Sequence, residues 1–262
     1  MRLLLTPSTR FEYRYRALLL FVSQPVLAAA VALWRQTSDP WYAIQVPMQL
    51  AWPAAVMAVL GTWIRVQASS YFTSVKVAQP DAMTDEIVDT GPFGSVRNPL
   101  YLGSLLEFFG YAVCFGWVPA FVYVLFHLLR YQRVVLHEEE LFGKAFGTQF
   151  VTYCQVVPRW IPRSPWKLFY GSRWTMDAVF GNGPFIGLAA GVIVSAMTGT
   201  LWPVVPLEAA GFLMAGLHFL FRSQAHASAE TVCATEDRER QSDGSGVTNG
   251  LAASSQSYAG RG

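Results

Sequence analysis

Apolar runs that approach the roughly 20 residues of a transmembrane helix recur along this chain and limit the folds open to it. Composition agrees, because 53% of the 262 residues are hydrophobic and 14% are charged, whereas soluble domains carry roughly 25% charged residues. The sequence therefore predicts an all-α fold, a polytopic membrane helical bundle. About six spans are expected, at residues 17–34, 44–64, 100–116, 120–135, 179–205 and 207–221.

Polar segments divide these spans into three regions. Residues 1–170 are expected to form a core with the first four spans, and residues 171–222 an additional transmembrane hairpin. Residues 223–262 are rich in Ser, Gly, Ala, Gln and Glu, which predicts a disordered tail. Charged and apolar residues alternate at helical spacing over 136–157, which predicts an amphipathic helix at the membrane surface. The basic start and the Ala-rich first run also fit a cleaved signal peptide, and that alternative stays open.

The distribution of Lys and Arg predicts the orientation. With the N-terminus inside, all 19 of these residues except Arg35 lie on the cytoplasmic side or in the tail. Both termini are therefore expected to be cytoplasmic. A net charge of +2 indicates no nucleic-acid partner, and the three cysteines lack the spacing of a metal site, so no metal is expected.

The run GPFGSVRNPLYLG, residues 91–103, ends a polar loop and begins an apolar segment. Pro99 suits the first turn of a helix, which places Arg97 on a loop at the positive end of that helix. Two helices that turn near Trp117 each rise about 1.5 Å per residue, so Arg97 is expected level with residues 137–140, HEEE. A surface salt bridge is one interpretation. Three carboxylates against one arginine would instead leave unbalanced charge, which suits a small zwitterion or cation.

Two ionisable residues lie inside the third and fourth spans. Glu107 and His127 are equally far from the turn at Trp117 and are therefore expected at the same depth. Ionisable residues within a membrane are expensive and are often functional. We predict that Glu107 and His127 pair and line the inner end of an acceptor cavity as catalytic candidates. A purely structural pair is the alternative.

Two segments resemble the isoprenylcysteine carboxyl methyltransferase and phospholipid methyltransferase superfamily: VRNPLYLG (96–103) and HEEELFGKAFGTQFVTYCQVVPRWIP (137–162). The family pattern has Arg, His or Asn, Pro and an aromatic residue before a Gly, and later a glutamate pair, Phe-Gly, Tyr and Val-Pro. Asn98 stands where many members have His. The chain also continues into a hairpin and a tail, whereas the family usually ends soon after Val-Pro.

The resemblance implies a membrane methyltransferase that binds S-adenosyl-L-methionine at the cytosolic helix ends. It also implies a small or lipid-like acceptor that enters from the bilayer. Carboxylates suit the ammonium and sulfonium of the cofactor, and an arginine or a helix N-terminus suits its carboxylate. Arg97 and Glu139 would also act in catalysis. The cofactor-binding residues implied are Arg97, Asn98, Pro99, Tyr101, Gly103, His137, Glu138, Glu139 and Tyr153.

Two other functions compete with this one. Membrane sterol reductases share an Arg-x-Pro and Tyr-rich pattern and bind NADPH at the same end, but a 2′-phosphate requires clustered Arg or Lys, of which the segment has few. A non-catalytic membrane protein would leave the acidic cluster without a role.

Overall fold

The computed structural model describes residues 6–35, 44–71, 86–169 and 174–224. The described residues form helices joined by loops and contain no β-strand, which confirms the all-α prediction. Of the tail predicted over 223–262, residues 225–262 lie outside these residues, whereas Ser223 and Gln224 belong to the last helix. The chain divides into two units, Met1–Gly216 and Leu217–Gly262, and of the second the structure describes Leu217–Gln224, which are helical.

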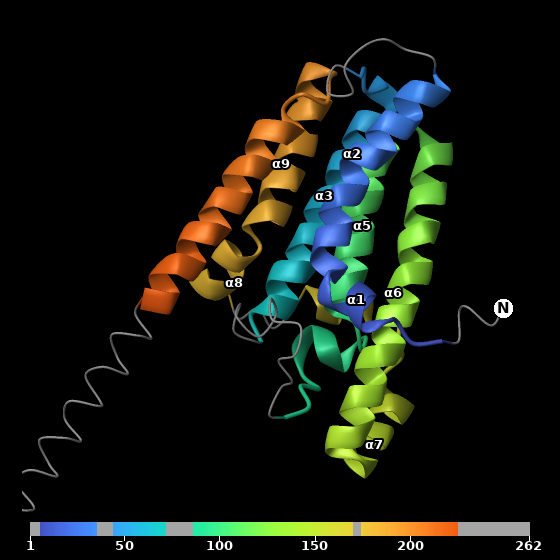
Figure 1. Cartoon of the computed structure of the whole chain (residues 1–262), viewed down its shortest axis with the longest axis vertical. Helices are drawn as coiled ribbons and strands as arrows, with labels where there is room; N and C mark the ends of the chain where they lie inside the picture. Colours follow the sequence, from blue (N-terminus) through green and yellow to red (C-terminus); the bar gives the residue numbers. More distant parts are fainter. Residues whose placement is uncertain (1–5, 36–43, 72–85, 170–173, 225–262) are drawn as a thin grey trace, which may run out of the picture. The chain divides into compact units, whose positions relative to one another are not determined.

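The order of elements is shown in Figure 1. Two short 3-10 helices, η3 (Gly91–Gly94) and η4 (Pro165–Leu168), lie in the loops. The α-helices are α1 (Arg10–Arg14), α2 (Arg16–Trp34), α3 (Met48–Ser69), α5 (Pro99–Val113), α6 (Trp117–Phe146), α7 (Thr148–Val156), α8 (Met176–Gly181), α9 (Gly183–Thr198) and a last helix, Val204–Gln224.

Helix ends follow local sequence signals. Pro99 occupies the first turn of α5, as predicted, where a missing N–H costs nothing. Thr9 and Glu12 form a reciprocal capping box at the start of α1. Gly116 (φ 114°) makes the turn between α5 and α6, and Gly147 (φ 52°) separates α6 from α7. Both φ values are readily reached only by glycine.

Helix α6 differs from the prediction. A span over 120–135 and a separate surface helix over 136–157 were expected, but α6 runs without a break from Trp117 to Phe146. The charged residues after 135 are good helix formers, so nothing interrupts the helix before Gly147. The last hairpin also differs in its bounds, because α9 ends at Thr198 and the next helix begins at Val204.

Helix α3 packs closely against α5 and α9. Small residues allow the backbones to approach, since a Cβ on Gly61 would lie 2.7 Å from the Glu107 Cβ, and one on Gly110 would lie 2.6 Å from the Ala54 carbonyl oxygen. The glycines of α9 play the same part against the following helix: a Cβ on Gly191 would lie 2.6 Å from the Val204 Cα. The backbone of α9 therefore lies in close contact with the helix that follows it.

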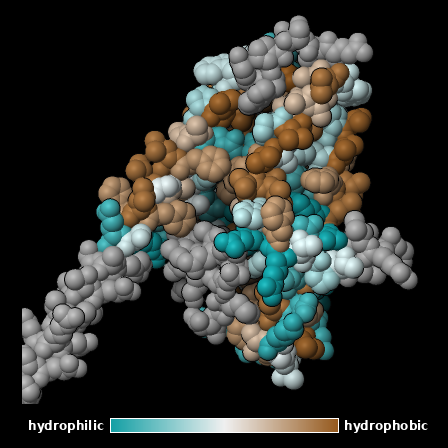
Figure 2. All heavy atoms as spheres, in the orientation of Figure 1, coloured by the Kyte–Doolittle hydropathy of each residue, from teal (hydrophilic) through white to brown (hydrophobic). Residues whose placement is uncertain are grey.

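Two helices of the described residues, Arg16–Trp34 and Val204–Gln224, are long and apolar enough to cross a membrane. Large apolar side chains on α2 and α6 also point outward, among them Val22, Val26, Phe121 and Leu125. In Figure 2 hydrophobic residues gather over the upper part of the first unit, and hydrophilic ones gather lower, where Figure 1 places α1 and the lower half of α6. These features support membrane association.

Candidate active site

A cavity of about 250 Å³ lies where the lower half of α6 meets the ends of α3 and α5. Helices α1, α2 and α7 and the loop before α5 complete its walls. The volume is slightly below the roughly 300–1,000 Å³ typical of small-molecule sites. Seven of the predicted site residues line it: Arg97, Asn98, Pro99, Tyr101, Glu138, Glu139 and Tyr153.

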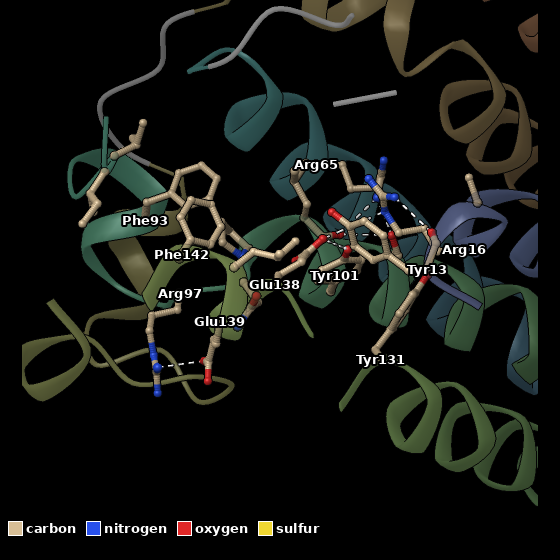
Figure 3. Close-up of a pocket in the computed structure, with 18 of the residues that line it drawn as sticks. Tyr13, Arg16, Arg65, Phe93, Arg97, Tyr101, Tyr131, Glu138, Glu139 and Phe142 are labelled. Carbon is tan, nitrogen blue, oxygen red and sulfur yellow. Dashed lines mark hydrogen bonds and ion pairs between the residues drawn. The ribbon is translucent and has the colours of Figure 1, made fainter. Parts of the chain in front are cut away.

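Arg97 and Glu139 meet at one side of this cavity (Figure 3). Arg97 Nη1 donates to Glu139 Oε1 at 2.7 Å and to Cys154 Sγ at 2.9 Å. Arg159 binds the same carboxylate with two donors, Nε at 3.0 Å and Nη2 at 2.5 Å. The Arg97 and Glu139 side chains are 14% and 17% exposed, so bulk water screens this pair only partly.

Glu138 lies on the other side of the cavity with Tyr101 and Arg16 (Figure 3). The Tyr101 hydroxyl donates to Glu138 Oε1 at 2.6 Å, whereas Arg16 Nε is 4.0 Å from the same oxygen. Burial raises the pKa of Glu138 above its usual 4.5, and the adjacent Glu139 raises it further, while Tyr101 and Arg16 oppose the shift. Glu138 is therefore less fully neutralised by cations than Glu139.

The predicted imbalance of three carboxylates against one arginine is wrong. Glu139 has two guanidinium partners, and exposed Glu140 pairs with Lys144 at 2.6 Å. Arg159 reaches Glu139 from the loop after α7. The sequence argument compared positions along α5 and α6 only, so it could not place this loop. Of the three carboxylates, Glu138 is the one whose nearest cation is 4.0 Å away.

Backbone contacts fix the loop that carries Arg97. The backbone N–H of Arg97 donates to the Pro158 carbonyl at 2.9 Å, and Asn98 Nδ2 donates to the Arg159 carbonyl at 3.2 Å. The Tyr153 hydroxyl donates to the Phe93 carbonyl at 2.8 Å. The two segments that carry the sequence pattern are thus bonded directly to each other, which holds the Arg97 guanidinium in place.

Two predicted binding residues lie outside the cavity lining. Gly103 faces α3, where a Cβ would lie 2.7 Å from the Gly61 carbonyl oxygen and 2.8 Å from the Arg65 Cγ. The His137 ring packs on the Tyr13 ring with centroids 4.7 Å apart. The structure thus gives Gly103 a packing role and places His137 against a residue that lines the cavity.

The predicted pair of Glu107 and His127 is not formed. Both side chains are buried, but Glu107 lies against Gly61 of α3, whereas His127 Nε2 is 3.0 Å from Ser23 Oγ of α2. Neither residue lines the cavity described above. Equal depth along two helices does not fix the direction of their side chains, and these two residues face different neighbours.

Several cavity residues were missed by the sequence analysis, namely Tyr13, Arg16, Arg65, Tyr131 and Phe185. They come from α1, α2, α3, α6 and α9, so no local motif contains them. Arg16 and Arg65 carried a signal in the sequence. Each is an arginine at the end of an apolar run, which is unusual enough to make it a site candidate.

Residues 50–149 match the model of the phospholipid methyltransferase family. This match covers Arg97 with its Pro99 motif and the glutamates of α6, and it confirms the resemblance given by the sequence. No curated protein and no solved structure matches the chain significantly.

Proposed function

We propose that the protein is an integral membrane methyltransferase that uses S-adenosylmethionine, because residues 50–149 match the model of the phospholipid methyltransferase family. Its acceptor is small or lipid-like and presents a carboxylate, hydroxyl, thiol or amine. The observation that carries the proposal is a cavity with a partly buried carboxylate at Glu138 and a fixed guanidinium at Arg97.

The cavity fits the charges of this cofactor. Ionised Glu138 can accept a hydrogen bond from an ammonium group, and its nearest cation is 4.0 Å away. Buried Arg97 Nε has no hydrogen-bond partner among the described residues, so it can donate to a carboxylate. Phe93, Phe142 and Phe150 line the cavity and would exclude water from the bound group. S-Adenosylmethionine supplies a methyl group that its sulfonium activates, so the protein mainly aligns the acceptor.

One observation favours a second candidate, an NADPH-dependent reductase. Arg16, Arg65 and Arg97 all line the cavity, which is more positive charge than the sequence motif alone contains. Clustered arginines can bind a 2′-phosphate. Glu138 and Glu139 line the same cavity and would repel it.

Equilibrium binding separates these two functions. We expect the purified protein in uncharged detergent to bind S-adenosylhomocysteine, measured by calorimetry, and to bind NADPH at least tenfold more weakly. Glu138 is the physical reason, because it attracts the amino group of the first ligand and repels the phosphates of the second. Tighter binding of NADPH would favour the reductase and contradict the proposal.

The proposed topology has six spans: α2, α3, α5, the part of α6 over 120–135, α9 and the helix Val204–Gln224. The Lys and Arg distribution supports it, with both termini and the cavity on the cytoplasmic side. We expect reporter fusions after Tyr71, Gly147 and Arg222 to be cytoplasmic and a fusion after Gly116 to be external. An external reporter after Gly147 would place the cavity on the wrong side for a cytosolic cofactor.

The raised pKa of Glu138 predicts two opposite pH dependences. Ionised Glu138 should bind the cofactor ammonium, so affinity for S-adenosylhomocysteine should rise with pH through the window above 4.5. The folded state holds this proton more tightly than the unfolded state, so its contribution to stability should fall over the same window. Calorimetry and thermal unfolding from pH 4.5 upward measure both effects.

Glu138→Gln is the matched variant for this prediction, since it keeps the shape and loses the titration. Both pH dependences should become flatter in it. If affinity kept its full pH dependence in Glu138→Gln, another group would be responsible and Glu138 would lose its assigned role.

A further inference from the structure

A second cavity, of about 270 Å³, lies between α2, α5 and the helix Val204–Gln224. It shares no lining residue with the cavity at Glu138, and all of its lining belongs to the first unit of the chain. Two polar side chains, Gln24 and Glu208, interrupt a wall that is otherwise apolar or aromatic. That wall includes Phe21, Pro25, Tyr111, Val204, Val205 and Phe212.

The proposed topology places this second cavity inside the membrane. From Arg16, where α2 begins at the cytoplasmic side, the helix rises about 12 Å to Gln24. From Val204, where the last helix begins at the external side, the chain rises about 6 Å to Glu208. In this topology the two polar side chains lie between the middle of the bilayer and its outer face, away from the cytoplasmic end that holds Glu138.

Gln24 and Glu208 bond to each other from two different helices. Gln24 Nε2 donates to Glu208 Oε1 at 2.7 Å. Gln24 is 4% exposed, and Glu208 is partly exposed. Within the described part of the chain Glu208 forms no ion pair, and this hydrogen bond is the one that its carboxyl group makes. Glu208 Oε2 and Gln24 Oε1 are therefore available to a ligand. Polar groups at such a depth are expensive and are often functional.

Pro25 adds a backbone acceptor to the same wall. It lies within α2 and has no N–H to donate to the carbonyl of Phe21, one turn earlier in the helix. Phe21 and Pro25 both line the cavity. Water does not reach the interior of a membrane to replace a missing donor, so this break in α2 also favours a ligand that can donate a hydrogen bond.

A hydroxyl group fits these atoms better than a charged group does. A hydroxyl both donates and accepts hydrogen bonds, so it can bond Glu208 whether that carboxyl is ionised or protonated. An ammonium group fits the ionised form alone, and an anion would meet no Lys or Arg in the lining. The apolar and aromatic wall suits an apolar body attached to the hydroxyl.

We propose that the second cavity binds a lipid alcohol, an uncharged hydrophobic molecule of the membrane with one hydroxyl group. The hydroxyl bonds the Gln24–Glu208 pair. The apolar body packs against Phe21 and Phe212, whose rings contact each other edge to face with centroids 4.8 Å apart. This binding site is separate from the proposed methyltransferase site and does not depend on that function.

Competitive photolabelling of the full chain in phosphatidylcholine vesicles tests the proposal, because that lipid has no O–H or N–H donor. The probe is an eight-carbon alcohol with a diazirine on its chain. Light should attach the probe to the segments Phe21–Pro25 and Val204–Phe212, which peptide mapping identifies.

Two isomers of equal size separate hydrogen bonding from hydrophobic partition. 1-Octanol has an O–H donor, whereas heptyl methyl ether has the same atoms and no donor. Octanol should prevent labelling at a mole fraction in the bilayer about threefold to tenfold lower than the ether does, the ratio expected for one hydrogen bond between neutral groups. Octylamine, which is cationic at neutral pH, should compete less well than octanol.

Glu208→Leu should abolish the preference for octanol over the ether. If that variant fails to fold, Ala209→Phe tests the cavity with the polar pair intact, because the added ring would fill space that Ala209 lines and should prevent labelling of both segments. Glu140→Leu is the matched control. It also replaces a carboxylate with leucine, but Glu140 is exposed, pairs with Lys144 and lies outside the cavity lining. Its preference for octanol should match that of the wild type.

Four results would overturn the proposal. The first is equal competition by octanol and the ether in the wild type, and the second is a preference that survives in Glu208→Leu. The third is labelling of the two segments that Ala209→Phe does not reduce. The fourth is stronger competition by octylamine than by octanol, which would make the cavity a site for a cation.

Discussion

Arg97→Ala should lower the affinity for S-adenosylhomocysteine at least tenfold and abolish detectable methyl transfer. The guanidinium is fixed by Glu139 at 2.7 Å and leaves its buried Nε free for a ligand carboxylate. Loss of one charge-assisted hydrogen bond costs about 1.5–3 kcal/mol, which corresponds to at least tenfold in affinity. Calorimetry measures the affinity, and transfer of a labelled methyl group measures activity.

Arg133→Ala is the control for this experiment, since it also removes one cation but lies outside the cavity lining. Its affinity for S-adenosylhomocysteine should stay within a factor of two to three, the scatter expected for such measurements. Glu139→Gln should weaken binding as well, and it should also destabilise the protein because Arg97 and Arg159 would lose their shared counter-charge. Unchanged binding in both Arg97→Ala and Glu139→Gln would remove the assigned site.

Gly110→Ala should destabilise the fold by about 1–3 kcal/mol, the usual cost of an overpacked core. The added Cβ would lie 2.6 Å from the Ala54 carbonyl oxygen and 2.7 Å from the Ala58 nitrogen. Both are backbone atoms of α3 and cannot rotate away, so α3 and α5 would have to separate. Thermal unfolding in detergent measures the loss.

Gly143→Ala makes the same substitution in a helix where nothing lies within 4 Å of the new Cβ. Alanine is the better helix former by about 1 kcal/mol, so this variant should be as stable as the wild type or more so. The two substitutions should therefore differ in sign. If Gly110→Ala were no less stable than Gly143→Ala, close packing of α3 on α5 would be contradicted.

The contact of Arg97 with Glu139 could be predicted from the sequence because it follows from helical geometry. Two helices that leave one turn rise equally per residue, and Pro99 fixed where one of them begins. The prediction succeeded even though α6 is longer than expected, since a continuous helix keeps the spacing between Trp117 and Glu139.

Contacts between distant segments could not be predicted in this way. Arg159 reaches Glu139 from the loop after α7, and Asn182 reaches Arg65 from the residue before α9. No periodicity or spacing links those positions. The failure of the predicted Glu107–His127 pair has a related cause, because depth was predicted but the rotation of each helix about its axis was not. That rotation is set by packing, here by Gly61 against Glu107.

Photochemical labelling with radioactive S-adenosylmethionine tests the central claim most directly, because it reports where the cofactor binds without requiring the acceptor. Ultraviolet light should attach the label to the wild type, and an excess of S-adenosylhomocysteine should prevent it. Peptide mapping should then place the label within Arg97–Tyr101 or Glu138–Tyr153, two segments that both line the cavity. Label confined to residues that do not line the cavity, or labelling that S-adenosylhomocysteine does not reduce, would contradict a methyltransferase site at this position.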